Sequence, residues 1–194
     1  CVLTDPPYGT TECVWDSAIP FDLMWEQLKR ITKPTAVVVL TASQPFTSTL
    51  VMSNIEQFRY CWVWEKALMT GFHFAKNRPL KAHEDIVVFS AGGTAHNAKI
   101  QSQYNPQMTA ADRFRKKDTT GRKLQSKFKP NRAAARVAMA PDYDGSKRYP
   151  RSIQRFSNAD HTGRIHPTQK PVALMAYLVR TYTQKGETVL DFTM

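Results

Sequence analysis

The sequence predicts an α/β fold with a doubly wound sheet, covered by helices on both faces. Short apolar strand patterns alternate with patterns of helical period, and this alternation favours such a sheet. Acidic residues follow two of the predicted strands directly, at the strand ends where sheets of this kind bind ligands. The alternation stops in one strongly basic segment. The 194 residues are enough for one domain with an insertion.

The first half of the chain carries most of the predicted elements. A short strand over residues 1–4 precedes a helix that ends before Pro34 and has one apolar face: Phe21, Met24, Trp25, Leu28 and Ile31. The β-branched run Ala36 to Leu40 predicts a buried strand. A second helix is expected from Phe46 to Phe58. Two strands are expected at 59–64 and 85–89, with a loop containing Gly71 and Pro79 between them.

The last predicted elements are an amphipathic helix and a strand. Pro171 suits a first helical turn, the apolar residues of 172–183 recur at helical spacing, and Gly186 lies beyond the helix end. The strand that follows stops at Asp191, which places a carboxylate at the ligand-binding edge of the sheet.

Asp5-Pro6-Pro7-Tyr8, directly after the first strand, resembles the catalytic tetrapeptide of amino-group methyltransferases, which act on an exocyclic amino group. The nitrogen of such a group is a poor nucleophile because its lone pair is delocalised into the base. If the Asp5 carboxylate and the Pro6 carbonyl each accept an amino hydrogen, the nitrogen is pushed toward tetrahedral geometry. Successive prolines hold the loop extended, and Tyr8 can stack on a base that has left the duplex. The same four residues also suit an ordinary turn.

The formal charge of +11 is concentrated in one third of the chain. Residues 95–160 contain 15 Lys and Arg against 5 Asp and Glu, with aromatic residues between them. Cations that meet phosphates and rings that contact unstacked bases suit a nucleic-acid surface, although low apolar content also fits a solvated, disordered segment. Six candidate DNA-binding residues follow from this pattern: Arg113, Arg115, Lys116, Lys117, Arg122 and Lys123.

Several functional classes lack support in the sequence. No apolar stretch approaches the roughly 20 residues that cross a bilayer, and no leader pattern is seen. The three cysteines, Cys1, Cys13 and Cys61, have no metal-ligand spacing and are typical of free thiols in a cytoplasmic protein. The five histidines also lack a ligand pattern, so no metal is predicted.

With both ends taken together, the chain resembles the beta class of amino-specific DNA methyltransferases, in which the catalytic motif precedes the cofactor motif. The resemblance covers most of the chain outside the basic segment. It rests on Asp5 to Gly9 and on four further stretches: Trp64-Glu65-Lys66, Gly71 to Lys81, His83-Glu84 and His166 to Pro171.

The resemblance implies a partial Rossmann-like methyltransferase sheet with a basic target-recognition insertion. It divides the chain into a catalytic part (1–94), the insertion (95–164), and a helix and strand that lead into the cofactor site (165–194). S-adenosylmethionine is the implied methyl donor, held by Lys170, Pro171, Asp191 and Phe192. Asp5 and Pro6 would hold the target amino group, with Pro7 shaping the loop and Tyr8 stacking on the base.

The implied substrate is double-stranded DNA, methylated at adenine N6. Methylation of cytosine N4 and a non-catalytic DNA-binding remnant stay open as alternatives, and a homodimer is compatible with the sequence. The family pattern continues after Asp191-Phe192 with a glycine-rich turn that this chain lacks, and it includes residues before Cys1. The chain is therefore expected to be a portion of a methyltransferase truncated at both ends.

Overall fold

The computed structural model describes residues 1–14, 16–111, 146–159, 165–166 and 168–193. These fall into two compact units, one formed by Cys1–Asn105 with Arg151–Met194 and the other by Pro106–Pro150. Within the described part of the second unit, the strands β5 (Thr109–Ala110) and β6 (Lys147–Arg148) form an antiparallel pair. The predicted boundaries at residues 94 and 164 stay a prediction.

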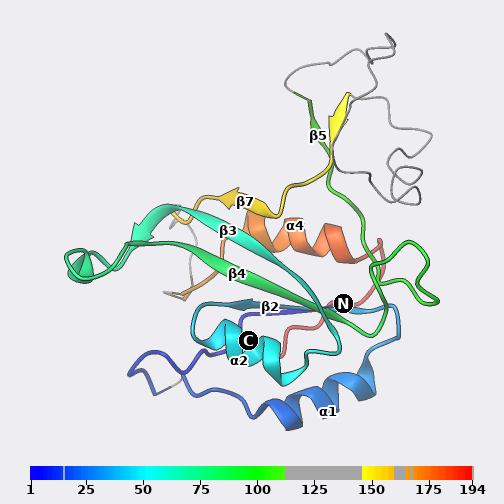
Figure 1. Ribbon diagram of the computed structural model, residues 1–194, viewed down its shortest axis with the longest axis horizontal. Coiled ribbons are helices and arrows are strands. Elements are labelled where there is room, and N and C mark those ends of the chain that lie inside the picture. Colours follow the sequence, from blue (N-terminus) through cyan, green and yellow to red (C-terminus); the bar gives the residue numbers. More distant parts are fainter. Residues whose placement is uncertain (15, 112–145, 160–164, 167, 194) are drawn as a thin grey trace, which may run out of the picture. The chain divides into compact units, whose positions relative to one another are not determined.

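The first unit contains a five-stranded sheet in the order β1-β2-β4-β3-β7 (Figure 1). Its strands in chain order are β1 (Val2–Thr4), β2 (Val37–Ala42), β3 (Phe58–Thr70), β4 (Lys81–Ser90) and β7 (Ile153–Phe156). The pairs β1/β2 and β3/β7 are parallel, and β4 runs antiparallel to both of its neighbours. The sheet is therefore mixed, with β3 and β4 forming a long hairpin.

Helices cover both faces of this sheet. Helices α1 (Phe21–Ile31) and α2 (Phe46–Ser53) pack on one face, and α4 (Val172–Tyr182) packs on the other (Figure 1). All six residues of β2 are buried, and its five apolar side chains alternate between the two resulting apolar cores. The predicted α/β class with helices on both faces is confirmed. Among the described residues, no helix is long and apolar enough to cross a membrane.

Four elements differ clearly from their predicted extent. The strands expected at 59–64 and 85–89 are longer, because β3 and β4 pair as far as Thr70 and Lys81. Helix α2 ends at Ser53 rather than at Phe58, because the backbone of Asn54 leaves the helical region, with φ of −152° and ψ of 56°. The strand expected before Asp191 is reduced to a parallel bridge between Leu190 and Val2. Two backbone hydrogen bonds of 3.0 Å hold that bridge, so the segment nevertheless lies beside β1.

This topology brings distant parts of the chain to one edge of the sheet. β1 and β2 are parallel, and Leu190 pairs in parallel with β1 on its other side. Their carboxyl ends therefore meet at the same edge. Thr4, Thr41 and Asp191 all lie there, next to the loop that begins at Asp5.

Candidate catalytic site

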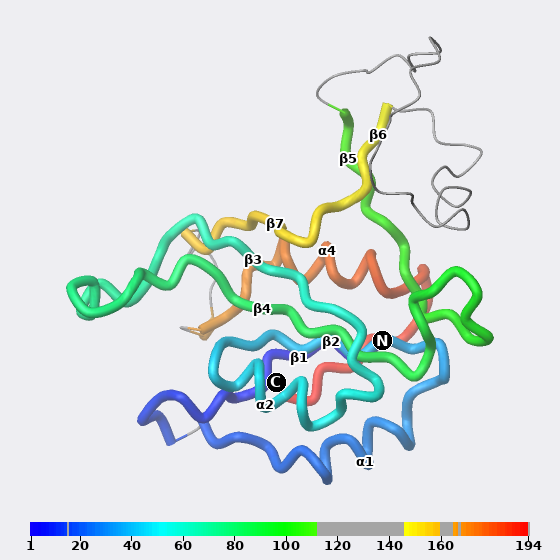
Figure 2. Tube along the Cα trace, viewed as in Figure 1, coloured from blue at the N-terminus to red at the C-terminus, as the bar shows by residue number. Residues whose placement is uncertain are grey.

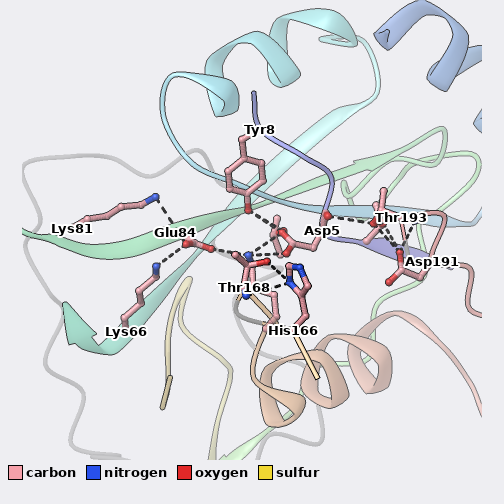
Figure 3. A network of polar contacts seen from close by, with 12 residues as sticks. Asp5, Tyr8, Lys66, Lys81, Glu84, His166, Thr168, Asp191 and Thr193 are labelled. Atoms are coloured by element: carbon pink, nitrogen blue, oxygen red, sulfur yellow. Dashed lines mark hydrogen bonds and ion pairs between the residues drawn. The ribbon is translucent and has the colours of Figure 1, made fainter. Parts of the chain in front are cut away.

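Asp5 is the centre of a polar cluster at this edge (Figure 3). Its Oδ1 accepts hydrogen bonds from the Tyr8 hydroxyl at 3.1 Å and from the Thr41 hydroxyl. The ammonium of Lys170 lies 2.9 Å from the same carboxylate. The Asp5 side chain keeps 28% of its surface exposed, so it is held on three sides and stays accessible to a ligand.

The phenol of Tyr8 is both a donor to Asp5 and part of the apolar packing. Its ring stacks on Phe46 with centroids 5.1 Å apart and planes inclined by 24°. The Lys170 ammonium lies 5.5 Å from the centroid of the same ring. Burial, reinforced by the carboxylates of Asp5 and Glu84, raises the pKa of Tyr8 well above its ordinary value. The hydroxyl therefore remains a hydrogen-bond donor.

A chain of charged side chains extends from Asp5 along the β3–β4 hairpin. Lys170 lies between Asp5 and Glu84, with its Nζ 3.3 Å from Glu84 Oε2. Glu84 Oε1 accepts a 2.6 Å bond from Lys66, and Lys81 Nζ is 3.9 Å from it. Burial alone would raise the pKa of Glu84, but the ammonium groups of Lys170 and Lys66 outweigh it and hold this pKa below its ordinary value. Glu84 is thereby the anionic anchor of Lys170.

The loop after Asp5 is fixed by its own hydrogen bonds. Asp16 accepts bonds from the backbone N–H groups of residues 9–11 and from the Thr11 hydroxyl, at 2.7 to 2.9 Å. Burial opposes the charge of this carboxyl, but these bonds together hold the pKa of Asp16 below its ordinary value. Gly9 takes φ of +63°, which favours glycine. Pro6 is buried and Pro7 is half-buried within this constrained loop.

Hydroxyl groups connect Asp191 to the same site. Asp191 Oδ1 accepts bonds from the Thr4 hydroxyl at 2.6 Å and from the Thr193 backbone at 3.0 Å. The Thr193 hydroxyl lies 3.2 Å from the carbonyl oxygen of Asp5 and 3.1 Å from Asp191 Oδ1. The ring of Phe192 packs against the core under α1 and α2. Thus four of the predicted catalytic and cofactor residues share one hydrogen-bonded network: Asp5, Tyr8, Lys170 and Asp191.

Lys170 stays a predicted cofactor-binding residue, and its ammonium contacts two carboxylates, those of Asp5 and Glu84. Pro171 caps the start of α4, and its carbonyl accepts bonds from the first turn of that helix.

The six predicted DNA-binding residues lie outside the described residues: Arg113, Arg115, Lys116, Lys117, Arg122 and Lys123. Within the described part of the chain, no group of acidic, cysteine and histidine side chains could hold a metal ion.

Sequence reasoning did not identify the residues that orient the site: Thr4, Thr41, Lys66, Glu84 and Thr193. Thr4 and Thr41 lie at or near the ends of β1 and β2, so a polar residue at the end of a buried strand was the available signal. Lys66 and Glu84 lie within the stretches that carry the family resemblance, without a role assigned to them there.

Comparison with known proteins identifies the family. A family model described as DNA methylase (N6_N4_Mtase) matches residues 1–194, and the chain belongs to that family. PvuII DNA methyltransferase (cytosine-N4-specific) has a similar structure, with a TM-score of 0.57 and 13% sequence identity over 98% of this chain and 65% of that one. This similarity shows that the two proteins share a fold.

Two structures of M1.HpyAVI also match, each with a TM-score of 0.49 over 98% of this chain. The one described as a complex with SAM is 18% identical and 70% covered, and the other is 14% identical and 66% covered. The chain thus spans about two thirds of the length of these proteins. The comparison with curated proteins gave no match.

Proposed function

We propose that the protein transfers a methyl group from S-adenosylmethionine to the exocyclic amino group of a base in double-stranded DNA, with adenine N6 as the target. The observation that carries this proposal is the Asp5 carboxylate, which is partly exposed and held by three donors at the carboxyl end of β1. Membership of the DNA methylase family supports the substrate class.

The residues around Asp5 suit the activation of an amino group. A carboxylate offers about four lone-pair directions, and the bonds from Tyr8, Thr41 and Lys170 use three of them. One direction therefore remains for an amino hydrogen of the target base. The Pro6 carbonyl, in the loop fixed by Asp16, is the proposed second acceptor. Two fixed acceptors cost no reorganisation when the nitrogen becomes tetrahedral.

The residues beside Asp5 fit the proposed methyl donor. S-adenosylmethionine supplies an electrophilic methyl sulfonium when it is bound. The bonds described for Asp191 fall on Oδ1, and a carboxylate at this strand end suits the hydroxyl and ammonium donors of such a ligand. We therefore assign Asp191 and Phe192 to cofactor binding, and we keep Pro171 as the third residue of that proposed site. We assign Lys170 the role of holding the Asp5 carboxylate in place, since its ammonium already contacts two carboxylates.

DNA binding is proposed to depend on the basic segment of residues 95–160. Reversing the charges of Arg113, Arg115, Lys116 and Lys117 should weaken DNA binding and flatten its salt dependence, because each lost phosphate contact removes counterion release. An unchanged salt slope would place the DNA-binding surface elsewhere.

Cytosine N4 is the alternative target. Its amino group is planar and conjugated like that of adenine, so the acceptors at Asp5 and Pro6 suit both bases. The structural similarity to a cytosine-N4-specific enzyme supports keeping this alternative. A DNA-binding remnant without turnover is the second alternative, from a different functional class.

The proposal is tested by incubating the protein with S-adenosylmethionine and unmethylated DNA and analysing the nucleosides by mass spectrometry. We expect N6-methyladenine from the wild type and none from Asp5→Ala, with DNA affinity retained. Asp22→Ala, which removes an exposed carboxylate on α1, is the matched control and should keep full activity. Detection of N4-methylcytosine instead would show that the target base is cytosine. Full activity in Asp5→Ala would refute the mechanism, and no product from any variant would favour the DNA-binding remnant.

A further inference from the structure

The β3–β4 hairpin projects well beyond the sheet, as the Cα trace shows (Figure 2). We call residues 67–80 the hairpin tip. It is closed by the pairing of Thr70 with Lys81 and begins its turn at Gly71, whose φ of +90° lies in the left-handed region. Hydrogen bonds of 3.0 Å from Phe74 N to the Gly71 carbonyl and from Arg78 N to the Phe74 carbonyl fold it into a compact turn. The tip is thus an ordered structure.

The hairpin tip exposes large apolar side chains. Phe72 is 64% exposed and Phe74 is 48% exposed, while Leu68 and Met69 on the adjoining strand are 51% and 46% exposed. Single exposed apolar residues are normal on protein surfaces. Four of them within the projecting hairpin tip indicate an interaction site.

The charge of this region selects the kind of partner. The hairpin tip contains two cationic residues, Lys76 and Arg78, and no Asp or Glu. The Arg78 guanidinium lies 4.2 Å from the centroid of the Phe74 ring. This pairing presents a cation and an aromatic surface side by side. A polyanion that also offers flat apolar surfaces, as a nucleic acid does, satisfies both features.

The base of the hairpin is part of the candidate catalytic site. Lys66 in β3 and Glu84 in β4 form the 2.6 Å pair that anchors Lys170 beside Asp5 (Figure 3). From Lys66 the strand runs four residues to Thr70, which is about 13 Å at roughly 3.3 Å per residue. The major groove of B-DNA is about 12 Å wide and admits a two-stranded ribbon. A duplex that presents a base to Asp5 is therefore within reach of the tip.

We propose that the hairpin tip enters a groove of duplex DNA beside the target base, with Phe72 as an apolar wedge and Lys76 and Arg78 against the flanking phosphates. This inference rests on the proposed function, because a base can reach Asp5 only after it has left the stack. Proteins that unstack DNA insert apolar side chains between base steps, where they replace the lost stacking contacts.

A binding experiment tests the phosphate contacts without catalysis. The affinity of the protein for a fluorescently labelled 24-base-pair duplex is measured by anisotropy over a range of NaCl concentrations. In the double variant Lys76→Gln/Arg78→Gln, the slope of log K against log[NaCl] should fall by about 1.8, because each phosphate contact contributes about 0.9. Lys29→Gln/Arg30→Gln, which removes two exposed charges from α1, should leave the slope unchanged. An unchanged slope in the hairpin variant, or an equal fall in both, would overturn the proposal.

A single-turnover experiment tests the wedge. The duplex carries the methylated site mapped with wild-type enzyme, either fully paired or with an abasic position opposite the target base. Phe72→Ala should lower the rate about tenfold on the paired duplex and stay within about twofold of wild type on the abasic duplex, where unstacking is easier. Leu23→Ala, which truncates an exposed apolar residue of α1, is the control.

An unchanged rate in Phe72→Ala, or an equal fall on both duplexes, would overturn the wedge. Loss of self-association by Phe72→Ala at unchanged DNA affinity would instead assign the tip to a second copy of the chain, and overturn the proposal too. The methyltransferase function and the DNA contact of the hairpin tip are tested independently. If the wild type methylates no DNA, the proposed function fails, and the salt slope still decides whether the hairpin tip contacts DNA.

Discussion

Replacement of Lys170 by methionine is the most direct test of how the catalytic motif is held. Methionine keeps most of the apolar length of the side chain but removes the ammonium. That ammonium lies 2.9 Å from Asp5 and 3.3 Å from Glu84, and only 10% of the lysine side chain is exposed. The variant therefore leaves two neighbouring carboxylates without the cation between them.

The size of the effect follows from these distances. With an effective dielectric constant of about 20, the gross attractions to Asp5 and Glu84 are about 6 and 5 kcal/mol. Desolvation of the buried ions offsets several kcal/mol for each of them, so removing one partner typically costs 3 to 5 kcal/mol net. We expect about 3 kcal/mol, because Asp5 retains some contact with water. For a chain of this size, that corresponds to a fall in Tm of about 6 to 12 °C.

The assay compares urea and thermal unfolding of wild type, Lys170→Met, Glu84→Gln and the double variant. The double variant should lose less stability than the sum of the two single variants, because the pair is shared. Lys185→Met, which alters an exposed lysine just after α4, is the control. The rate of methyl transfer should fall with Lys170→Met, because Asp5 loses an orienting donor. A Lys170→Met protein as stable and as active as wild type would refute this account of the site.

Three further predictions concern single side chains. Thr41→Val should lower the free energy of unfolding by about 1 to 3 kcal/mol and lower the methylation rate, because it removes a fully buried hydroxyl that donates to Asp5; wild-type kinetics would contradict this. The folded-state pKa of Glu84 is depressed, so its contribution to stability is present above its unfolded pKa of about 4.3 and is lost as pH falls through the folded value. The difference in unfolding free energy between wild type and Glu84→Gln should therefore shrink below about pH 4.3, and a pH-independent difference would contradict the assignment. Burial, together with the Asp85 carboxylate, raises the pKa of the Cys61 thiol to about 11, so iodoacetamide at pH 8 should label the exposed Cys13 well before Cys61, as peptide mass spectrometry would show.

The elements that the sequence predicts well are those with a local signal. Helix α1 has the expected bounds because its apolar face repeats at helical spacing and Pro34 stops it. The strand β2 follows from its run of β-branched residues. The end of α2 could not be predicted in this way, because Phe58 is apolar and continues the helical pattern. It belongs to β3 because its ring packs against Phe89 across the sheet, which is a tertiary contact.

The same distinction applies to the candidate site. Asp5 and Asp191 were recognisable because each directly follows a strand pattern. The contact between Lys170 and Asp5 joins residues 165 positions apart, and it depends on how α4 docks against the sheet. The pairing of Lys66 with Glu84 depends on the register of two antiparallel strands, in which Trp64 faces Glu84. No local pattern contains that register.

The hydrogen bonds that join Thr4 to Asp191 have a consequence for the order of folding. These residues are 187 positions apart, whereas Thr41 and Asp5 are separated by 36. Closing the longer loop costs about 1.5 kcal/mol more in chain entropy by the logarithmic dependence on loop length. Contacts of such high separation are favoured only after the intervening elements have reduced the effective loop. We therefore expect Asp191 to reach its final place in the site when the segment at Leu190 docks beside β1, after the intervening elements have formed.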